Sequence, residues 1–203
     1  MTAAVRRLLV GGTAGGVGTT TITALVFTTV RDRTGAGPTL LDHTAGDLGA
    51  RLADGDEVSR VDDRLELTDL GPRALDVGVA ELADPAVVLT MVSAATPVGV
   101  GLAAAGVQSV QHAHGPAGLA RTVVVLVGVH GRHRLARPLA PLVASAHLRG
   151  VVVVPPDLAI AAGGRIPSSR TRPGTRRALD DLVELLHAGR RAQPASWSWS
   201  LPG

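Results

Sequence analysis

A glycine-rich segment near the start of the chain has the residue types that bind phosphate groups. It reads Gly-Gly-Thr-Ala-Gly-Gly-Val-Gly-Thr-Thr-Thr from Gly11 to Thr21, after a short apolar stretch and before a stretch typical of a helix. Glycines let a backbone approach a phosphate closely, and the N–H groups at a helix N-terminus attract the anion. A glycine-rich turn without a ligand is the alternative. The residues expected to contact phosphate are Gly15, Gly16, Val17, Gly18, Thr19, Thr20 and Thr21.

The residue types that are missing restrict the chemistry further. The 203 residues include no Cys, no Tyr and no Lys, so all 20 basic residues are Arg. Without Cys the chain has no disulfide framework, no cysteine-based zinc site and no cysteine nucleophile. Without Tyr and Lys it also lacks the groups on which several classes of enzyme depend for proton transfer or covalent catalysis.

Apolar segments and helical patterns alternate along the chain. Strands are expected at Arg7–Gly11, Thr39–Asp42, Leu65–Asp69, Val87–Val92, Thr122–Val127 and Val151–Val154. Helices are expected at Thr19–Arg31, Gly46–Ala53, Pro72–Ala83, Pro97–His112, Leu135–His147 and Thr175–Ala188. This pattern predicts an α/β fold with a doubly wound, mostly parallel sheet. Because ligands bind beyond the carboxyl ends of the strands in such sheets, a site is expected in the segments that follow the strands.

The spacing of the glycines allows two interpretations of the segment. Read as Gly12-x-x-x-Gly16-x-Gly18, it resembles the dinucleotide fingerprint of short-chain dehydrogenases, with Asp42 placed to hold a ribose. The chemistry of that family relies on a Tyr and a Lys, and this chain has neither. This resemblance therefore leaves a non-catalytic, NAD(P)-binding Rossmann regulator as one alternative function.

Read against the P-loop, the run from Ala14 to Thr21 resembles the variant Walker A motif of the ParA/MinD family of ATPases. Other segments resemble that family in order and spacing, over roughly residues 5–188. They are Pro38–Asp42, similar to the strand that ends in the switch I aspartate; Gly46–Leu52, similar to the sequence after that aspartate in the septum-site and pilus-assembly branch; Leu67–Pro72, similar to the Walker B strand; and Val151–Asp157, similar to the strand and proline turn beside the base. The resemblance implies a P-loop NTPase-like three-layer sandwich.

The resemblance also implies roles for particular residues. ATP or ADP would bind with Mg²⁺, and Thr20, Asp42 and Asp69 would be the candidate metal ligands. The two aspartates would also be the candidate catalytic groups, and Pro155 would lie beside the nucleotide base. Capping of the loops after two strands is the alternative role of the aspartates.

The departures from the family pattern remove positive charge from the loop. The lysine that contacts phosphate falls at Thr19, and the signature lysine that reaches the partner's nucleotide falls at Ala14. Arg6 and Arg7 precede the strand and are expected to point elsewhere. One missing electrostatic group of this kind costs about 10²–10³ in rate, so weak or absent hydrolysis is expected. The other departures are Thr13 for the first loop glycine, Thr44 for the second switch I aspartate, and Gly128 for the asparagine that reads adenine.

Charge is distributed unevenly along the chain. The net charge is +3, but residues 1–84 carry 8 Arg and 13 acidic residues, and residues 85–203 carry 12 Arg and 4 acidic residues. The arginines within Arg132–Arg137 and Arg165–Arg177 could contact DNA phosphates non-specifically, or they could form a solvated face. Two histidine pairs have ligand-like spacing but no nearby acidic residue to complete a metal site; they are His112 with His114 and His130 with His133.

The remaining features concern organisation and location. One P-loop NTPase-like domain is expected over residues 1–189, and a flexible tail with Trp197 and Trp199 over residues 190–203. The uncharged stretch Pro85–Gln111 is interrupted by polar residues and is interpreted as a buried strand followed by a helix. Membrane association is therefore not expected, and the expected location is the cytoplasm.

Together these observations favour a ParA/MinD-like P-loop protein with a degenerate nucleotide site. Its expected role is a positioning or scaffolding module for a protein partner. The alternatives are an active ATPase that switches its association with a partner, DNA or a membrane, and the NAD(P)-binding regulator. Loss of the signature lysine at Ala14 argues against a dimer that shares nucleotide, whereas a homodimer through another face is compatible with the sequence.

Overall fold

The computed structural model describes residues 6–44, 48–52, 60–129, 142, 145, 147–161, 164–166 and 170–187. Several sequence-based expectations lie outside these residues. They are the tail over 190–203, His130 and His133, the arginines of 132–137, and most of the helix expected over 135–147.

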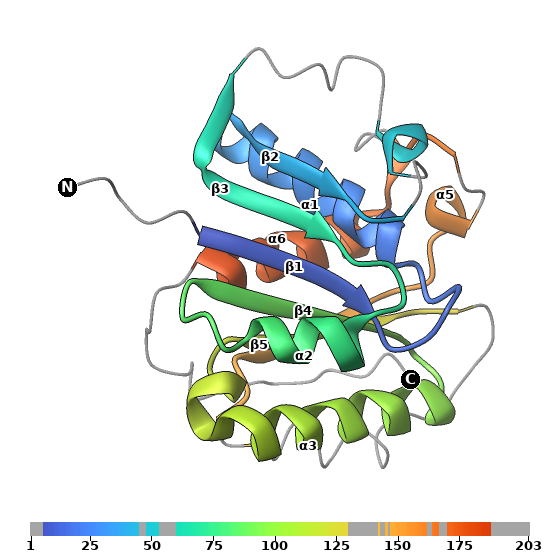
Figure 1. Cartoon of the computed structure of the whole chain (residues 1–203). Helices are drawn as coiled ribbons and strands as arrows, with labels where there is room; N and C mark the ends of the chain where they lie inside the picture. Colours follow the sequence, from blue (N-terminus) through green and yellow to red (C-terminus); the bar gives the residue numbers. More distant parts are fainter. Residues whose placement is uncertain are drawn as a thin grey trace.

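A six-stranded sheet forms the centre of the described region, and its neighbouring strands are all parallel. The strands are β1 Arg6–Gly12, β2 Gly37–Asp42, β3 Val61–Asp69, β4 Val87–Ala94, β5 Thr122–Val127 and β6 Gly150–Val154. They lie in the order β2-β3-β1-β4-β5-β6 (Figure 1). This confirms the parallel α/β sheet predicted from the sequence. It also brings the carboxyl ends of all six strands to one edge, called the carboxyl edge below.

Helices cover both faces of the sheet (Figure 1). On one face lie α1 (Thr19–Thr34) and α6 (Pro173–His187), and on the other lie α2 (Val79–Glu81) and α3 (Pro97–Leu119). The other elements are short: the 3-10 turn η1 (Gly49–Arg51), the π turn η2 (Ala74–Gly78) and the helix α5 (Leu158–Ala161).

Alternate residues of the central strands enter two separate cores. In β5, Val123 and Val125 pack into the core that α1 and α6 cover, whereas Val124 and Leu126 pack into the core that α3 covers. Burial on both faces explains why β4, β5 and β6 are continuous apolar runs. The strand residues that fill the two cores also fix the positions of the strand ends. The loops at the carboxyl edge therefore begin from a well-packed sheet.

Close packing replaces the helix expected over Pro72–Ala83 by the π turn η2 and the short helix α2. An added Cβ on Gly11 would lie 2.9 Å from Ala74 Cα, and one on Gly78 would lie 2.8 Å from Leu89 Cδ1. These glycines let η2 approach β1 and β4 closely, and the wider π turn accommodates that approach. Of the helix expected over Gly46–Ala53, the described residues form only the turn η1.

Several other elements are longer than the sequence predicts, and β3 and α3 differ most. β3 begins at Val61 rather than at Leu65, because its first residues pair with Gly37 and Pro38 across a register shift. α3 continues to Leu119 through a kink at Gly115, which has φ 59° and precedes Pro116. Glycine adopts this left-handed conformation without steric cost, and proline cannot donate the backbone hydrogen bond that would continue the helix.

Within the described residues, no helix combines the length and apolar character that crossing a membrane requires. The uncharged stretch Pro85–Gln111 forms β4 and the greater part of α3, which confirms its interpretation as a strand followed by a helix.

Candidate functional site

The glycine-rich segment forms a loop at the carboxyl edge, between the end of β1 and the start of α1. Gly16 and Gly18 have φ values of 73° and 89°, in the left-handed region that favours glycine. An added Cβ on Gly15 or Gly16 would meet no atom within 4 Å, so the outer side of the loop is open. The sequence-predicted loop is therefore present, with its glycines where a ligand would approach the backbone.

The N-terminus of α1 faces this open side with unused backbone donors. Its first intrahelical hydrogen bond runs from the N–H of Ile22 to the carbonyl of Gly18, at 2.9 Å. The preceding N–H groups, those of Thr19, Thr20 and Thr21, have no intrahelical acceptor by the geometry of a helix start. No acidic residue lies in the first turn, and Gly18 supplies no side-chain cap. The positive end of the helix dipole is thus directed toward an anion on the loop.

Thr19 fills the inner side of the loop. Its side chain is buried, and an added Cβ on Gly12 would collide with its hydroxyl oxygen and lie 2.9 Å from Val17 Cγ2. The residue at the position of the family's phosphate lysine is therefore neutral and turned back into the protein.

A buried chain of hydrogen bonds fixes the loop to β4 and α3. The Thr13 hydroxyl donates to Ser93 Oγ at 2.8 Å, and the Ser93 hydroxyl donates to the carbonyl of Gly99 at 2.8 Å. The N–H of Thr13 also donates to the carbonyl of Val92 at 2.9 Å. Sequence reasoning identified Thr13 only as a departure from the family pattern. It did not identify Ser93. The available signal was that Ser93 is a serine within an otherwise apolar strand.

Asp42 and Asp69 lie side by side at the carboxyl ends of β2 and β3, where they are register partners. Asp69 is fully buried, and its Oδ1 accepts a hydrogen bond from the N–H of Gly71 at 2.8 Å. Gly71 in turn accepts a hydrogen bond from the N–H of Gly12 at 2.7 Å, which joins the end of β3 to the loop.

Asp42 is exposed and caps its own loop. Its Oδ1 accepts hydrogen bonds from the N–H of Thr44, at 2.7 Å, and from the Thr44 hydroxyl, and its Oδ2 accepts from the N–H of Leu48 at 3.2 Å. Both aspartates thus perform the loop-capping role that the sequence offered as the alternative. Their roles as ligands, with Thr20, remain predictions.

The end of β5 is pressed against the proline turn after β6. The N–H of Gly128 donates to the carbonyl of Val154 at 2.7 Å, and an added Cβ on Gly128 would lie 2.5 Å from both Pro156 N and Pro156 Cδ. A side chain at Gly128 would require this turn to shift, so the close backbone contact is consistent with the absence of the family's asparagine here. Pro155 lies on the same turn, beside the start of α6, where an added Cβ on Gly174 would be 3.4 Å from its Cγ.

Asp157, the next residue, is a buried carboxylate that holds α5 and α6 in place. It accepts hydrogen bonds from the N–H of Ala159 at 3.0 Å, the N–H of Arg172 at 2.8 Å and the Thr175 hydroxyl at 2.8 Å. Burial alone would raise the pKa of Asp157, but these hydrogen bonds and the charge of Arg172 outweigh it and hold that pKa below its ordinary value. Sequence reasoning placed Asp157 in the proline turn without a role.

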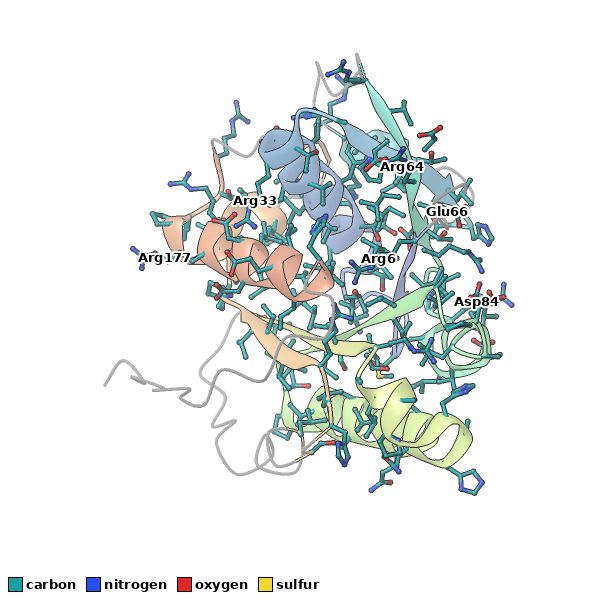
Figure 2. All side chains as sticks on the ribbon, turned by 90° about the vertical axis from the view of Figure 1, so that its left-hand side faces the viewer. Arg6, Arg33, Arg64, Glu66, Asp84 and Arg177 are labelled. Atoms are coloured by element: carbon teal, nitrogen blue, oxygen red, sulfur yellow. The ribbon has the colours of Figure 1, made fainter. Side chains whose placement is uncertain are left out.

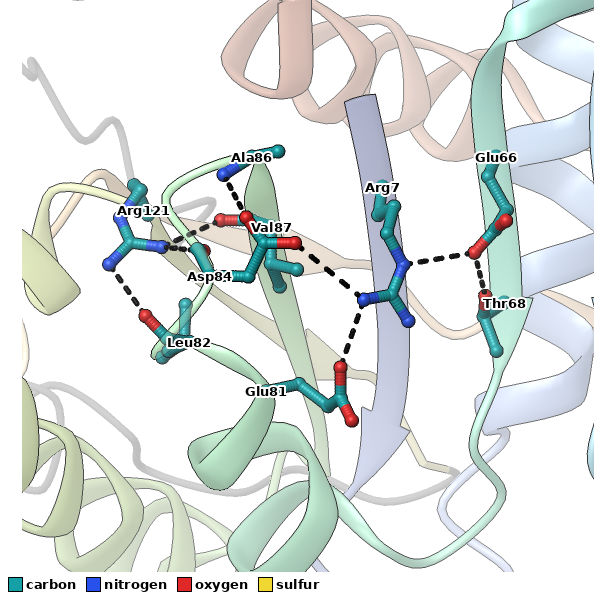
Figure 3. Close-up of polar contacts among 9 residues, drawn as sticks. All are labelled: Arg7, Glu66, Thr68, Glu81, Leu82, Asp84, Ala86, Val87 and Arg121. Atoms are coloured by element: carbon teal, nitrogen blue, oxygen red, sulfur yellow. Dashed lines mark hydrogen bonds and ion pairs between the residues drawn. The ribbon is translucent and has the colours of Figure 1, made fainter. Parts of the chain in front are cut away.

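The two arginines that precede the loop point away from it, as the sequence predicts. Arg7 pairs at the amino end of the sheet with Glu66 at 3.1 Å, Glu81 at 3.0 Å and Asp84 at 3.9 Å (Figure 3). Arg6 donates to the carbonyl of His187, at the end of α6. Neither guanidinium therefore supplies the charge that the loop lacks.

A third arginine, Arg73, does follow a strand at the carboxyl edge. It stands two residues after Gly71, which is hydrogen-bonded to the loop, and its Nε lies 3.8 Å from Asp76 Oδ2. About half of its side chain is exposed, so its contact with Asp76 is a weak surface pair. Sequence reasoning did not single out Arg73.

Four exposed arginines surround the start of α6. Arg170, Arg172, Arg176 and Arg177 are exposed, and none of them forms an ion pair with a described residue. Arg177 extends outward from α6 in Figure 2. Among the described residues no group of three or more His, Asp or Glu side chains could hold a metal ion. His114, from one predicted pair, is instead hydrogen-bonded through Nε2 to the carbonyl of Val79 at 2.7 Å.

The strand order separates the two interpretations of the loop. In a dinucleotide-binding Rossmann fold the second strand lies next to the first, so that the acid at its end reaches the ribose. Here β3 lies between β1 and β2, which moves Asp42 one strand further from the loop. The geometry expected for a dinucleotide is therefore not present.

Comparison with known proteins gives the same answer for the fold. No family model matches the sequence, and no curated protein matches it significantly. Among solved structures, the chain is similar to a ParA family ATPase from Chlorobium tepidum, with a TM-score of 0.62 over 90% of this chain and 98% of that chain. The chain has the fold of a ParA family ATPase. The sequence identity is 13%, so this similarity concerns the fold alone.

Proposed function

We propose that the chain is a ParA/MinD-like P-loop protein that binds nucleotide phosphates but hydrolyses them weakly or not at all. The observation that carries the proposal is the open glycine loop beneath the uncapped start of α1, with the neutral Thr19 at the position of the phosphate lysine. Backbone N–H groups can hold phosphate oxygens there, and no side-chain cation of the loop neutralises charge in the transition state.

The residues at this edge fit a magnesium nucleotide in part. The loop residues Gly15 to Thr19 would hold the phosphates, and the Thr20 hydroxyl and the exposed Asp42 carboxylate are oxygen ligands of the kind that Mg²⁺ prefers. Asp69 is fully buried, and its direct role is to fix the backbone at Gly71. Bound Mg²⁺ would neutralise charge on the phosphates. Asp69 would act by positioning the β3 end against the loop.

The expected rate of hydrolysis follows from the missing charge. Phosphoryl transfer depends almost entirely on positioning and charge neutralisation. Removing one preorganised electrostatic group costs about 10²–10³ in rate, and both lysine positions of the loop are occupied here by neutral residues. A protein of this kind serves as a positioning or scaffolding module, which binds a protein partner or a second copy of itself without rapid turnover.

Calorimetric titration of the full chain with Mg-ATP, followed by measurement of phosphate release, tests this proposal. The wild type should bind Mg-ATP. Gly16→Val should weaken binding at least tenfold, because a β-branched residue at φ 73° is strained. Gly101→Ala is the matched control, since Gly101 is an exposed residue within α3 with no atom near an added Cβ. Equal affinities for the wild type and Gly16→Val, or no binding by either, would refute the loop as the binding site.

The arginines at the start of α6 favour a second activity, non-specific binding of DNA phosphates. Arg170, Arg172, Arg176 and Arg177 are exposed, and none of them forms an ion pair with a described acidic residue. Each phosphate contact contributes about −0.9 to the slope of log affinity against log salt concentration, so replacing all four by Gln should reduce that slope by about 3–4.

The control for this experiment replaces two other exposed arginines, Arg60 and Arg64, by Gln and should leave the slope unchanged. Fluorescence anisotropy with a labelled duplex measures the affinity at each salt concentration, and these affinities give the slope. Binding that is insensitive to salt, or equal loss in both sets of variants, would contradict an arginine-phosphate interface at α6.

A further inference from the structure

The surroundings of the loop show where the rest of a bound nucleotide would lie. Toward β3 the loop is closed, because the N–H of Gly12 is bonded to Gly71 and Gly11 packs against Ala74. Toward β5 the loop is adjacent to the strand end: an added Cβ on Gly18 would lie 3.9 Å from Val127 Cγ1. A group attached to phosphates on the loop is therefore directed toward the carboxyl ends of β5 and β6.

Among the described residues of the wall at that position, few N–H or O–H groups are free to donate a hydrogen bond to a base. The N–H of Gly128 is used by the carbonyl of Val154, and the contact with Pro156 leaves no room for a side chain. Pro155 and Pro156 have no N–H to donate. At the neighbouring end of β4, Ala95 is apolar, and the hydroxyl of Thr96 accepts the hydrogen bond that caps α3.

Asp157 is the buried carboxylate of this wall, and its described hydrogen bonds all run to the protein itself. Both carboxylate oxygens accept hydrogen bonds, Oδ1 from Ala159 and Oδ2 from Arg172 and Thr175, and its side chain is 5% exposed. A carboxylate that recognises a base must present an accessible oxygen lone pair to the base N–H groups, and this side chain is almost completely buried. Asp157 therefore caps the start of α6 and is not available to recognise a ligand.

We infer that this site selects its ligand by the phosphates and not by the base. This inference rests on the proposed phosphate site and specifies its ligand class: nucleoside triphosphates of any base, and inorganic tripolyphosphate. A site built to hydrogen-bond a ligand group discriminates between ligands by about 10⁴–10⁵ in specificity, whereas apolar contact discriminates by about 10–200 at most. The described wall offers mainly apolar contact, and its Gly128 N–H and Asp157 carboxylate are already hydrogen-bonded within the protein.

Competitive titration of the full chain, in the presence of Mg²⁺, with ATP, GTP, CTP and inorganic tripolyphosphate tests the inference. The three nucleotides should bind within about fivefold of each other, and tripolyphosphate within about tenfold of them. An affinity for ATP more than 100-fold above those for GTP and CTP, or a tripolyphosphate affinity far below that of all nucleotides, would overturn the inference and leave the proposed function standing. Failure of all four to bind would instead refute the phosphate site itself.

A pair of variants separates base recognition by Asp157 from its structural role. Asp157→Asn should lower stability but leave the ratio of ATP to GTP affinities unchanged, measured at a temperature where circular dichroism shows the variant folded. Asp181→Asn, an exposed position on α6, is the control for the change of charge. A change of tenfold or more in the ATP to GTP ratio for Asp157→Asn alone would show that this carboxylate reads the base and would overturn the inference.

Discussion

Replacing Asp157 by Asn should remove one of the main interactions that fix α6 to the sheet. The carboxylate is 5% exposed and accepts three hydrogen bonds, from Ala159 N, Arg172 N and Thr175 Oγ1. The introduced amide has one acceptor oxygen instead of two, and its NH₂ group would face one or two of these donors. Each buried donor that loses its acceptor costs about 1–3 kcal/mol, so the free energy of unfolding should fall by about 2–4 kcal/mol.

The effect should depend on pH, with a sign set by the lowered pKa of Asp157. A carboxylate with a depressed pKa in the folded state stabilises the fold at pH values above its unfolded pKa, about 3.9, and loses this effect as the pH falls through the folded value. The difference between the wild type and Asp157→Asn should therefore be largest at neutral pH and shrink as the pH approaches 3.

Urea denaturation followed by circular dichroism, repeated between pH 7 and pH 3, measures the loss in free energy of unfolding and its pH dependence. Asp181→Asn should change stability by no more than about 0.5 kcal/mol at any of these values, because Asp181 is exposed on the same helix. A loss for Asp157→Asn as small as that of the control, or one that does not vary with pH, would refute the account of Asp157 as a charged cap.

Three other substitutions should change stability in directions set by the structure, each measured by urea denaturation. Thr90→Val should stabilise the fold by about 1 kcal/mol, because the Thr90 hydroxyl is buried without a hydrogen-bond partner among the described residues; destabilisation would contradict this. Gly128→Ala should cost about 2–3 kcal/mol through its clash with Pro156, and a neutral effect would show that the backbones are further apart. Arg121→Met should cost about 2 kcal/mol, because the guanidinium donates to the carbonyls of Leu82, Asp84 and Val87 (Figure 3). An unchanged midpoint of urea denaturation would show that these hydrogen bonds make no net contribution to stability.

The sheet and the loop could be predicted from the sequence because local pattern determines both. Continuous apolar runs such as Thr122–Val127 occur where a strand is covered on both faces, and β5 has those bounds. The backbone is left-handed at Gly16 and Gly18, a conformation that favours glycine. The spacing of the glycines in the sequence therefore predicts the loop. The direction of Arg7 away from the loop was also foreseeable, because Arg7 lies at the amino end of the strand whose far end carries the loop.

The features that the sequence did not predict depend on contacts between distant segments. Ser93 joins the loop to α3 through residues that are far apart in the chain, and a serine within an apolar strand does not by itself indicate those partners. Asp157 caps a helix that begins at Pro173, after an intervening segment. The role of Gly128 required knowledge that β6 ends in prolines against it. In each case tertiary proximity, which one sequence does not reveal, decides the function of the residue.

We propose that the loop binds nucleotide phosphates but lacks the charge needed to hydrolyse them. The most direct measurement is phosphate release from Mg-ATP by the wild type, Thr19→Lys and Ala105→Lys, the last adding the same charge at an exposed position of α3. We expect little phosphate release by the wild type and Ala105→Lys, and a rate of release about 10²-fold higher for Thr19→Lys. Rapid release by the wild type, with no gain from Thr19→Lys, would contradict this proposal.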